Sequence, residues 1–240
     1  MSTEAVEFGV RQSMRERLDV LRRLVHPLAS RGRPVRVLEI GSYEGASALM
    51  WSRAVGELCP DGGSVLCVDP WEPYLGDEDI NSNQTCRDMQ EDLHTGAAFE
   101  RFTNNIKHDD PRAPISFMRG TVVSRWNELR ALSRFDLIYI DGSHIYEDVL
   151  SDIRRCVSCL LHLDGTICGD DLERQADEVS EKELRAHRHR EYTDGYHPGV
   201  TAAVWKVFGR VPCDHGVWWV ENVPRALTHL VDGYVSGEWI

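Results

Sequence analysis

The sequence predicts a doubly wound α/β fold with a mostly parallel sheet and a helical extension at the N-terminus. Apolar strand-like runs alternate with amphipathic helical stretches along most of the chain. The clearest unit covers residues 135–171, where an apolar strand ends at Asp141, a helix follows, and a second apolar strand ends at Asp170 and Asp171. A right-handed crossover of this kind makes neighbouring strands parallel and brings their carboxyl ends to one edge of the sheet.

The length and composition indicate one domain for the 240 residues, with a helical extension over 1–33, an α/β core over 34–222 and a C-terminal tail over 223–240. Asp and Glu outnumber Lys and Arg by 39 to 27, which gives a formal net charge of -12. Such a charge argues against nucleic acid and anionic membrane surfaces as partners, and it favours a small molecule.

The N-terminus shows no export signal, because no basic segment precedes an apolar core there, and no apolar run approaches the length of a membrane span. We therefore expect a cytoplasmic protein. Seven cysteines are an odd number in such a chain, which argues against a disulfide framework. Cys156 and Cys159 form a C-x-x-C inside a predicted helix, without a second pair at zinc spacing, so we assign them to packing.

The first helix is expected over residues 10–29, where apolar residues recur on one face, and residues 34–40 follow as an apolar strand. Gly41 and Gly45 then allow a tight turn before a helix over 46–54, whose N-terminal amides face whatever binds there. The spacing of these glycines differs from the G-x-G-x-x-G fingerprint of dinucleotide-binding proteins. An ordinary strand-to-helix turn explains the glycines about as well as a cofactor site does.

The second strand, over residues 64–69, ends in Asp69, at the place where doubly wound folds use an acid to accept hydrogen bonds from ribose hydroxyls. The polar, acidic segment 72–98 is too long for an ordinary connection, so it is expected to be either a lid or binding loop, or a solvated helix and loop. A helix over 97–107 and a third strand over 114–120 follow.

The helix that connects the two acid-ended strands is expected over residues 145–163. The charged segment 172–198 is either a helical lid over the ligand edge or a solvated stretch. A helix over 200–208 and a late strand over 217–221 complete the core. The histidines of the charged segment, which are expected to be solvated rather than to bind a metal, are His187, His189 and His197.

Three carboxylates are therefore expected at one edge of the sheet: Asp141 after one strand, and Asp170 and Asp171 after the next. Carboxylates this close repel one another unless a cation lies between them, and an all-oxygen ligand set suits Mg²⁺, Ca²⁺ or Mn²⁺. In the alternative, one acid caps a helix and the others are solvated loop residues. Their position at the ends of two consecutive strands, where open α/β sheets bind ligands, favours the ligand site.

The motifs at the strand ends are Glu39-Ile-Gly41-Ser-Tyr43-Glu-Gly45-Ala-Ser47, Asp69, Ile140-Asp-Gly-Ser-His144, and Asp170-Asp171. In this order they resemble class I S-adenosylmethionine-dependent O-methyltransferases that use a divalent metal and have a Rossmann-like sheet. The resemblance covers roughly residues 35 to 210. Within that family, the later motifs resemble the branch that methylates sugar hydroxyls in macrolide, other antibiotic and glycan biosynthesis. The catechol and caffeoyl-coenzyme-A branches carry Lys at the position of His144, so this sequence departs from them there.

The resemblance implies two cofactors, S-adenosylmethionine and Mg²⁺ or Mn²⁺. It implies that Asp141, Asp170 and Asp171 bind the metal. His144 would be the catalytic base that removes the proton of the acceptor hydroxyl. The cofactor-binding residues it implies are Glu39, Gly41, Ser42, Tyr43, Gly45 and Ser47 around the first turn, Asp69 at the ribose, Trp71 beside the adenosine, Gly120, Thr121 and Val122 near the adenine, and Asp141.

The expected reaction is methyl transfer to an oxygen of a small molecule, most plainly a sugar hydroxyl, with the metal as Lewis acid and template. One alternative is an NAD-dependent oxidoreductase, which should show the missing three-glycine fingerprint. The other is a silent nucleoside-binding protein, which has no need of three converging carboxylates plus His144. Trp205, Trp218 and Trp219 belong either to the core or to an interface, so a homo-oligomer stays open.

Overall fold

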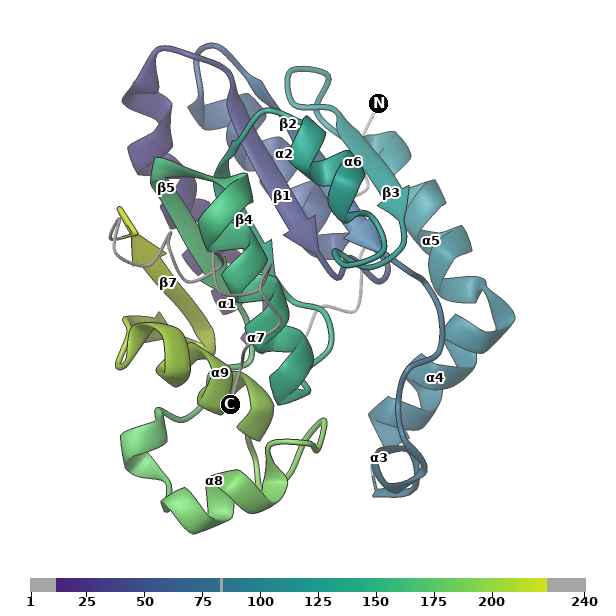
Figure 1. Ribbon diagram of the computed structural model, residues 1–240. Helices are drawn as coiled ribbons and strands as arrows, with labels where there is room; N and C mark the ends of the chain where they lie inside the picture. Colours follow the sequence, from purple (N-terminus) through teal and green to yellow (C-terminus); the bar gives the residue numbers. More distant parts are fainter. Residues whose placement is uncertain (1–11, 83, 224–240) are drawn as a thin grey trace.

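The computed structural model describes residues 12–82 and 84–223, so almost all of the tail expected over 223–240 lies outside the described part. Within that part, one sheet holds seven strands in the order β3-β2-β1-β4-β5-β7-β6 (Figure 1). The parallel strands are β1 (Val35–Ile40), β2 (Gly63–Asp69), β3 (Ile115–Arg119), β4 (Phe135–Ile140) and β5 (Leu161–Gly169). The antiparallel ones are β6 (Cys213–Asp214) and β7 (Val217–Glu221).

Helices cover both faces of this sheet. In β1, Val35 and Val37 join the core on one side, whereas Leu38 and Ile40 join the core on the other, because successive side chains of a strand point to opposite faces. The first core includes α1 (Gln12–Val25), α2 (Ala46–Leu58) and α5 (Ala97–Asn105), and the second includes α6 (Trp126–Ala131), α7 (Tyr146–Arg155) and α9 (Pro198–Phe208). This three-layer arrangement confirms the predicted doubly wound α/β fold with an N-terminal helix.

Three further helices extend beyond the carboxyl ends of the parallel strands (Figure 1). They are α3 (Asp77–Ser82), α4 (Gln84–Thr95) and α8 (Glu181–His187). The first two belong to the segment expected over 72–98, and α8 belongs to the charged segment 172–198. Both long polar segments therefore contain helices and border the same edge of the sheet. Short 3-10 turns complete the chain: η1 (His26–Arg31), η2 (Ile106–His108) and η4 (Ala176–Glu178).

The sequence predicted a helix over 145–163, and the predicted C-terminal end of this helix is wrong. Helix α7 passes into a π-helical turn, η3 (Cys156–Leu160), and Leu161 already pairs with Phe135 as the first residue of β5. Leu161 is buried in the same core as the apolar face of α7, which explains why the helical periodicity continues to that residue. In η3, Cys156 is buried and free, as the packing assignment of the C-x-x-C predicted.

The sequence assigned three tryptophans either to the core or to an interface, and two of them have different surroundings in the structure. Trp218 is buried in the core, whereas Trp205 of α9 is exposed. The short elements α6 and β6 have no counterpart among the expected elements. Across the described residues, no helix combines the length and the apolar character that crossing a membrane requires.

A buried carboxylate ties the N-terminal extension to the amino end of β4. Asp136 is 0% exposed, and its Oδ1 lies 2.8 Å from Arg31 Nη1 and 2.5 Å from Arg33 Nη2. Its Oδ2 accepts the backbone N–H of Arg36 at 2.9 Å. A buried charge is tolerated only when it is paired and hydrogen-bonded, so these contacts hold η1 and the start of β1 against β4.

We expect Asp136→Ala to lower the free energy of unfolding by about 3 kcal/mol, because it leaves Arg31 and Arg33 without their shared partner. Urea denaturation followed by circular dichroism measures this loss. Glu57→Ala is the matched control, since it removes an ion pair with Arg22 whose two side chains are about half exposed. The control should cost less than about 1 kcal/mol. If the two variants lose the same free energy of unfolding, the buried ion pairs of Asp136 stabilise the fold no more than an exposed ion pair does.

Candidate active site

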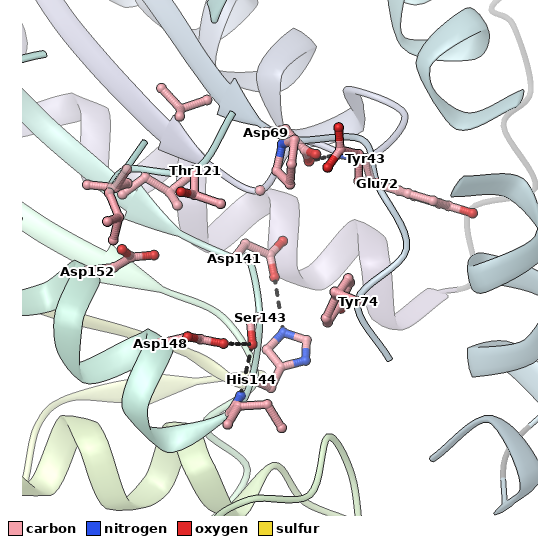
Figure 2. A pocket seen from close by; sticks show the side chains of 18 of the residues that line it. Tyr43, Asp69, Glu72, Tyr74, Thr121, Asp141, Ser143, His144, Asp148 and Asp152 are labelled. Atoms are coloured by element: carbon pink, nitrogen blue, oxygen red, sulfur yellow. Dashed lines mark hydrogen bonds and ion pairs between the residues drawn. The ribbon is translucent and has the colours of Figure 1, made fainter. Parts of the chain in front are cut away.

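A cavity of about 460 Å³ opens at the carboxyl edge of the sheet, beside the ends of β1, β2 and β4. Figure 2 shows side chains from these strand ends and from α7 around one space. This is the place where open α/β sheets bind ligands. The predicted site residues that line the cavity are Gly41, Tyr43, Asp69, Thr121, Val122, Asp141 and His144.

The turn between β1 and α2 approaches β4 so closely that only glycine fits. Gly41 has a φ of 81°, and a Cβ there would overlap the carbonyl oxygen of Asp141. Gly45 has a φ of 83° directly before α2, and a Cβ there would lie 2.9 Å from the ring of Phe102. Gly41 therefore lets the backbone of the turn reach the cavity, and Gly45 lets the start of α2 lie against Phe102 of α5.

Asp69 holds this turn in shape. Its Oδ2 accepts the backbone N–H groups of Ser42 at 2.7 Å and Tyr43 at 3.0 Å, and its Oδ1 accepts the backbone N–H of Trp71 at 2.6 Å. The indole Nε1 of Trp71 in turn donates to the carbonyl oxygen of Tyr43 at 2.7 Å. The three backbone N–H groups occupy three of the roughly four acceptor positions of the Asp69 carboxylate.

Trp71, which was expected beside the adenosine, and Glu39 do not line the cavity. The Trp71 side chain is buried, and its ring packs against Phe99 and Phe102 with centroid distances of 5.0 and 4.5 Å. Glu39 is buried within β1, and burial raises the pKa of its carboxyl to about 8. The other expected cofactor residues outside the lining are Ser42, Gly45, Ser47 and Gly120.

The three carboxylates predicted at the ends of β4 and β5 do come together. The Tyr139 hydroxyl donates to Asp141 Oδ2 at 3.0 Å and lies 3.3 Å from Asp170 Oδ2. Arg17 of α1 reaches the same cluster, with Nη1 3.0 Å from Asp170 Oδ2 and Nη2 2.8 Å from Asp171 Oδ1. Burial and the neighbouring carboxylates raise the pKa of Asp170 well above its usual value.

His144 lies between two buried carboxylates. Its Nε2 is 3.1 Å from Asp171 Oδ2, and its Nδ1 is 2.6 Å from Glu191 Oε1. Glu191 is also bound by the hydroxyl of Tyr74, which donates to Oε1 at 3.0 Å. Burial acts to lower the pKa of His144, but Glu191 and Asp171 outweigh it and raise this pKa well above its ordinary value. The two carboxylates therefore favour the protonated imidazole over the neutral form.

The expectation that the histidines of the charged segment are solvated is wrong for His197. Its side chain is 14% exposed, its Nδ1 lies 3.0 Å from Glu173 Oε1, and its ring centroid lies 4.5 Å from that of His144. His187 is half-buried, and His189 is exposed. The sequence alone could not separate the three, because they lie in one charged stretch with no clear periodicity.

Two acids of α7 that the sequence analysis missed also line the cavity, Asp148 and Asp152. Figure 2 shows Asp152 on the same side of the cavity as Thr121, where the segment after β3 itself offers no acid or amide. Burial raises the pKa of Asp152 to about 7. The four-residue spacing of these acids places both on one helix face, which was a usable signal. Glu191 was also missed, and nothing in its charged surroundings distinguishes it.

Comparison with known proteins gives a family and a fold. A family model described as a methyltransferase domain matches residues 38–172. Curated protein sequences give no match. Three similar solved structures are cofactor-bound Rv0187 from MTB (16% identity, 91% of this chain and 83% of that chain, TM-score 0.49), CalS11, a calicheamicin methyltransferase (15%, 88% and 80%, 0.50), and an O-methyltransferase from Bacillus cereus in complex with SAH (16%, 85% and 80%, 0.47). At such identity, the likeness to CalS11 shows a shared fold.

The bonds of Asp69 predict that Asp69→Ala loosens the turn before α2. Three backbone N–H groups lose a charged acceptor, so the free energy of unfolding should fall by about 2 to 4 kcal/mol. The amides of Ser42 and Tyr43 should also exchange with deuterium faster, as mass spectrometry of the corresponding peptide would show. Glu72→Ala is the matched control, because Glu72 lines the same cavity but is exposed. If exchange in the turn is the same in both variants, Asp69 does not hold the turn.

Proposed function

The chain belongs to the methyltransferase domain family, and we propose that it transfers a methyl group from S-adenosylmethionine to a hydroxyl oxygen of a small molecule. The acceptor class we propose is a sugar of a natural product or glycan. The observation that carries the proposal is the cavity at the carboxyl edge, which the glycine turn, Asp69 and His144 all face. Membership of this family argues against the alternative of an NAD-dependent oxidoreductase.

The lining of the cavity suits S-adenosylmethionine along its length. The turn at Gly41 and the carboxylate of Asp141 offer polar partners to the amino-acid end of the cofactor. Asp69 has about one acceptor position left, so it supports one hydrogen bond from the ribose rather than the two that the sequence suggested. Thr121 and Asp152 supply a hydroxyl and a carboxyl on the side left for the adenine.

The surroundings of His144 support a sugar as acceptor. Tyr74, which lines the cavity, is 41% exposed, and Tyr192 is 37% exposed with its ring 5.0 Å from that of His197. Partly exposed aromatic rings offer an apolar face, and polar residues of the cavity lining such as Ser143 and Asp148 offer hydrogen-bonding groups. A ring that carries several hydroxyl groups needs both kinds of contact.

Methyl transfer to a hydroxyl requires that the acceptor oxygen loses its proton and lies in line with the sulfonium methyl group. S-adenosylmethionine supplies the electrophilic methyl group. We assign the base to His144, whose ring faces the cavity and accepts the proton when it is in its neutral form. Glu191 and Asp171 orient the ring, and they stabilise the imidazolium that forms when it takes the proton.

The residues present do not fit the predicted Mg²⁺ or Mn²⁺ ion well. Arg17 bridges Asp170 and Asp171, where the ion was expected to lie between carboxylates. The ligand atoms that do come within 4.8 Å of one another, among the described residues, belong to His144, Asp171 and His197. That set contains two nitrogen ligands, whereas oxygen ligands suit Mg²⁺ and Mn²⁺. No step of the proposed mechanism therefore uses a metal.

Isothermal titration calorimetry tests the cofactor part of the proposal. The purified chain should bind S-adenosylhomocysteine, and S-adenosylmethionine likewise, and it should give no heat with NAD. The calorimeter measures affinity without the acceptor, so the result does not depend on finding the substrate. Binding of NAD in place of both sulfur nucleosides would refute the proposal.

His144→Ala should lower kcat by about 10² to 10⁴-fold with little change in the affinity for S-adenosylhomocysteine, because the variant loses its base but keeps the cofactor cavity. The assay is mass spectrometry of glycosylated natural products that gain one methyl group. His189→Ala is the control, since His189 is exposed and pairs with Glu147 outside the cavity. Near-normal kcat in a folded His144→Ala variant would remove His144 from the mechanism.

The pH dependence of the same assay separates a base from a merely structural histidine. Only the neutral imidazole accepts a proton, and the pKa of His144 is raised by Glu191 and Asp171 against the effect of burial. The rate should therefore rise with pH through one ionisation that lies above the ordinary histidine value. Glu191→Gln removes one of the two raising charges and should move this rise to lower pH. An unmoved profile would contradict the assignment.

A further inference from the structure

One arginine from the N-terminal helix pairs with two carboxylates of the acid cluster. All three guanidinium nitrogens of Arg17 are engaged. Nη1 lies 3.0 Å from Asp170 Oδ2, Nη2 lies 2.8 Å from Asp171 Oδ1, and Nε donates to the carbonyl oxygen of His215 at 3.2 Å. Asp171 lies 154 residues away from Arg17 in the sequence. A planar fork of donors matches two carboxylates better than a single point charge does.

The turn between β6 and β7 is shaped around this guanidinium. His215 and Gly216 have φ values of 51° and 84°, and the His215 carbonyl accepts from Arg17. A Cβ on Gly216 would lie 3.3 Å from Arg17 Nη2 and 3.4 Å from Asp170 Oδ1. Glycine therefore lets the turn lie against the ion pair. Asp171, which pairs with Arg17 Nη2, also has a positive φ, of 63°.

The carboxylate oxygens of the cluster already have partners. Asp170 Oδ1 accepts the backbone N–H of Asp171 at 2.8 Å, and Asp141 Oδ2 accepts the Tyr139 hydroxyl at 3.0 Å. Asp171 Oδ2 lies 3.1 Å from His144 Nε2. With the two oxygens that Arg17 contacts, five of the six oxygens of Asp141, Asp170 and Asp171 are engaged by protein groups. A divalent ion would have to displace several of them to gain its ligands.

We propose that Arg17 is the built-in cation of this cluster, so that the chain binds no divalent ion between β4 and β5 and transfers its methyl group without one. Buried carboxylates need a positive charge, and a guanidinium stays protonated at every relevant pH. By holding Asp171, Arg17 also positions the carboxylate that faces His144. The statement on metal binding is independent of the proposed function, whereas the statement on methyl transfer rests on it.

Electron paramagnetic resonance of Mn²⁺ tests the binding statement directly, because bound Mn²⁺ loses the sharp signal of the free ion. The wild-type chain should leave the signal unchanged. Arg17→Ala should take up Mn²⁺, since it leaves Asp170 without its cation and frees an oxygen of Asp171 as well. Arg17→Gln is a second variant that keeps the size of the side chain and should also bind Mn²⁺, whereas Arg17→Lys should not.

Arg23→Ala is the matched control. Arg23 lies on the same helix and pairs with Asp214 of β6 at 2.5 Å, so its removal also cuts a contact between α1 and the β6–β7 hairpin. This variant should bind no Mn²⁺. Saturable Mn²⁺ binding by the wild type at micromolar concentration would overturn the proposal. It would also be overturned if Arg17→Ala and Arg17→Gln, both shown to be folded by circular dichroism, failed to bind the ion.

The catalytic statement is tested by methyl transfer in excess chelator. The rate of the wild type should be unchanged by ethylenediaminetetraacetate and by added Mg²⁺. Loss of activity in chelator with recovery on Mg²⁺ would overturn the role of Arg17 and leave the proposed function standing. If no acceptor is methylated under any condition and S-adenosylhomocysteine also fails to bind, the proposed function is wrong. The Mn²⁺ titration then still decides whether Arg17 takes the place of a metal ion.

Discussion

The site depends on one electrostatic constraint, the compensation of carboxylates that the parallel sheet gathers at a buried edge. Asp141, Asp170 and Asp171 are placed there by the topology alone, since β4 and β5 are neighbours and end together. Repulsion among them must be balanced inside the protein or by a ligand. Arg17 lies against two of these carboxylates and His144 against Asp171, and the same contacts place His144 at the cavity.

The N-terminal extension supplies cations to both ends of the central strands. At the amino end of β4, Arg31 and Arg33 neutralise Asp136, and beyond the carboxyl end of β5, Arg17 neutralises Asp170 and Asp171. The extension is thus more than a cover for one face of the sheet, although α1 also buries apolar residues there. Its packing and its charges act on the same strands, so the geometry of the active edge depends on residues that precede the α/β core.

The sequence was sufficient to predict those site residues that follow from local pattern. It did not predict side chains that reach the site from distant segments of the chain. The acids at the strand ends and Gly41 could be predicted because periodicity and turn chemistry are local. Arg17 and Glu191 could not, because their contacts with Asp171 and His144 join segments that no spacing rule connects. For the same reason the sequence showed the negative charges of the cluster but not the arginine that pairs with two of them.

The bonds of Asp69 have a consequence for how the cofactor associates. Its carboxylate already fixes the backbone of the turn through Ser42 and Tyr43, and Trp71 anchors the turn from the core. A ligand that meets a finished surface loses little conformational entropy of the protein on binding, so its affinity reflects its own contacts. Association with this part of the chain should therefore resemble docking to a rigid template, with any slow rearrangement confined to the acceptor side.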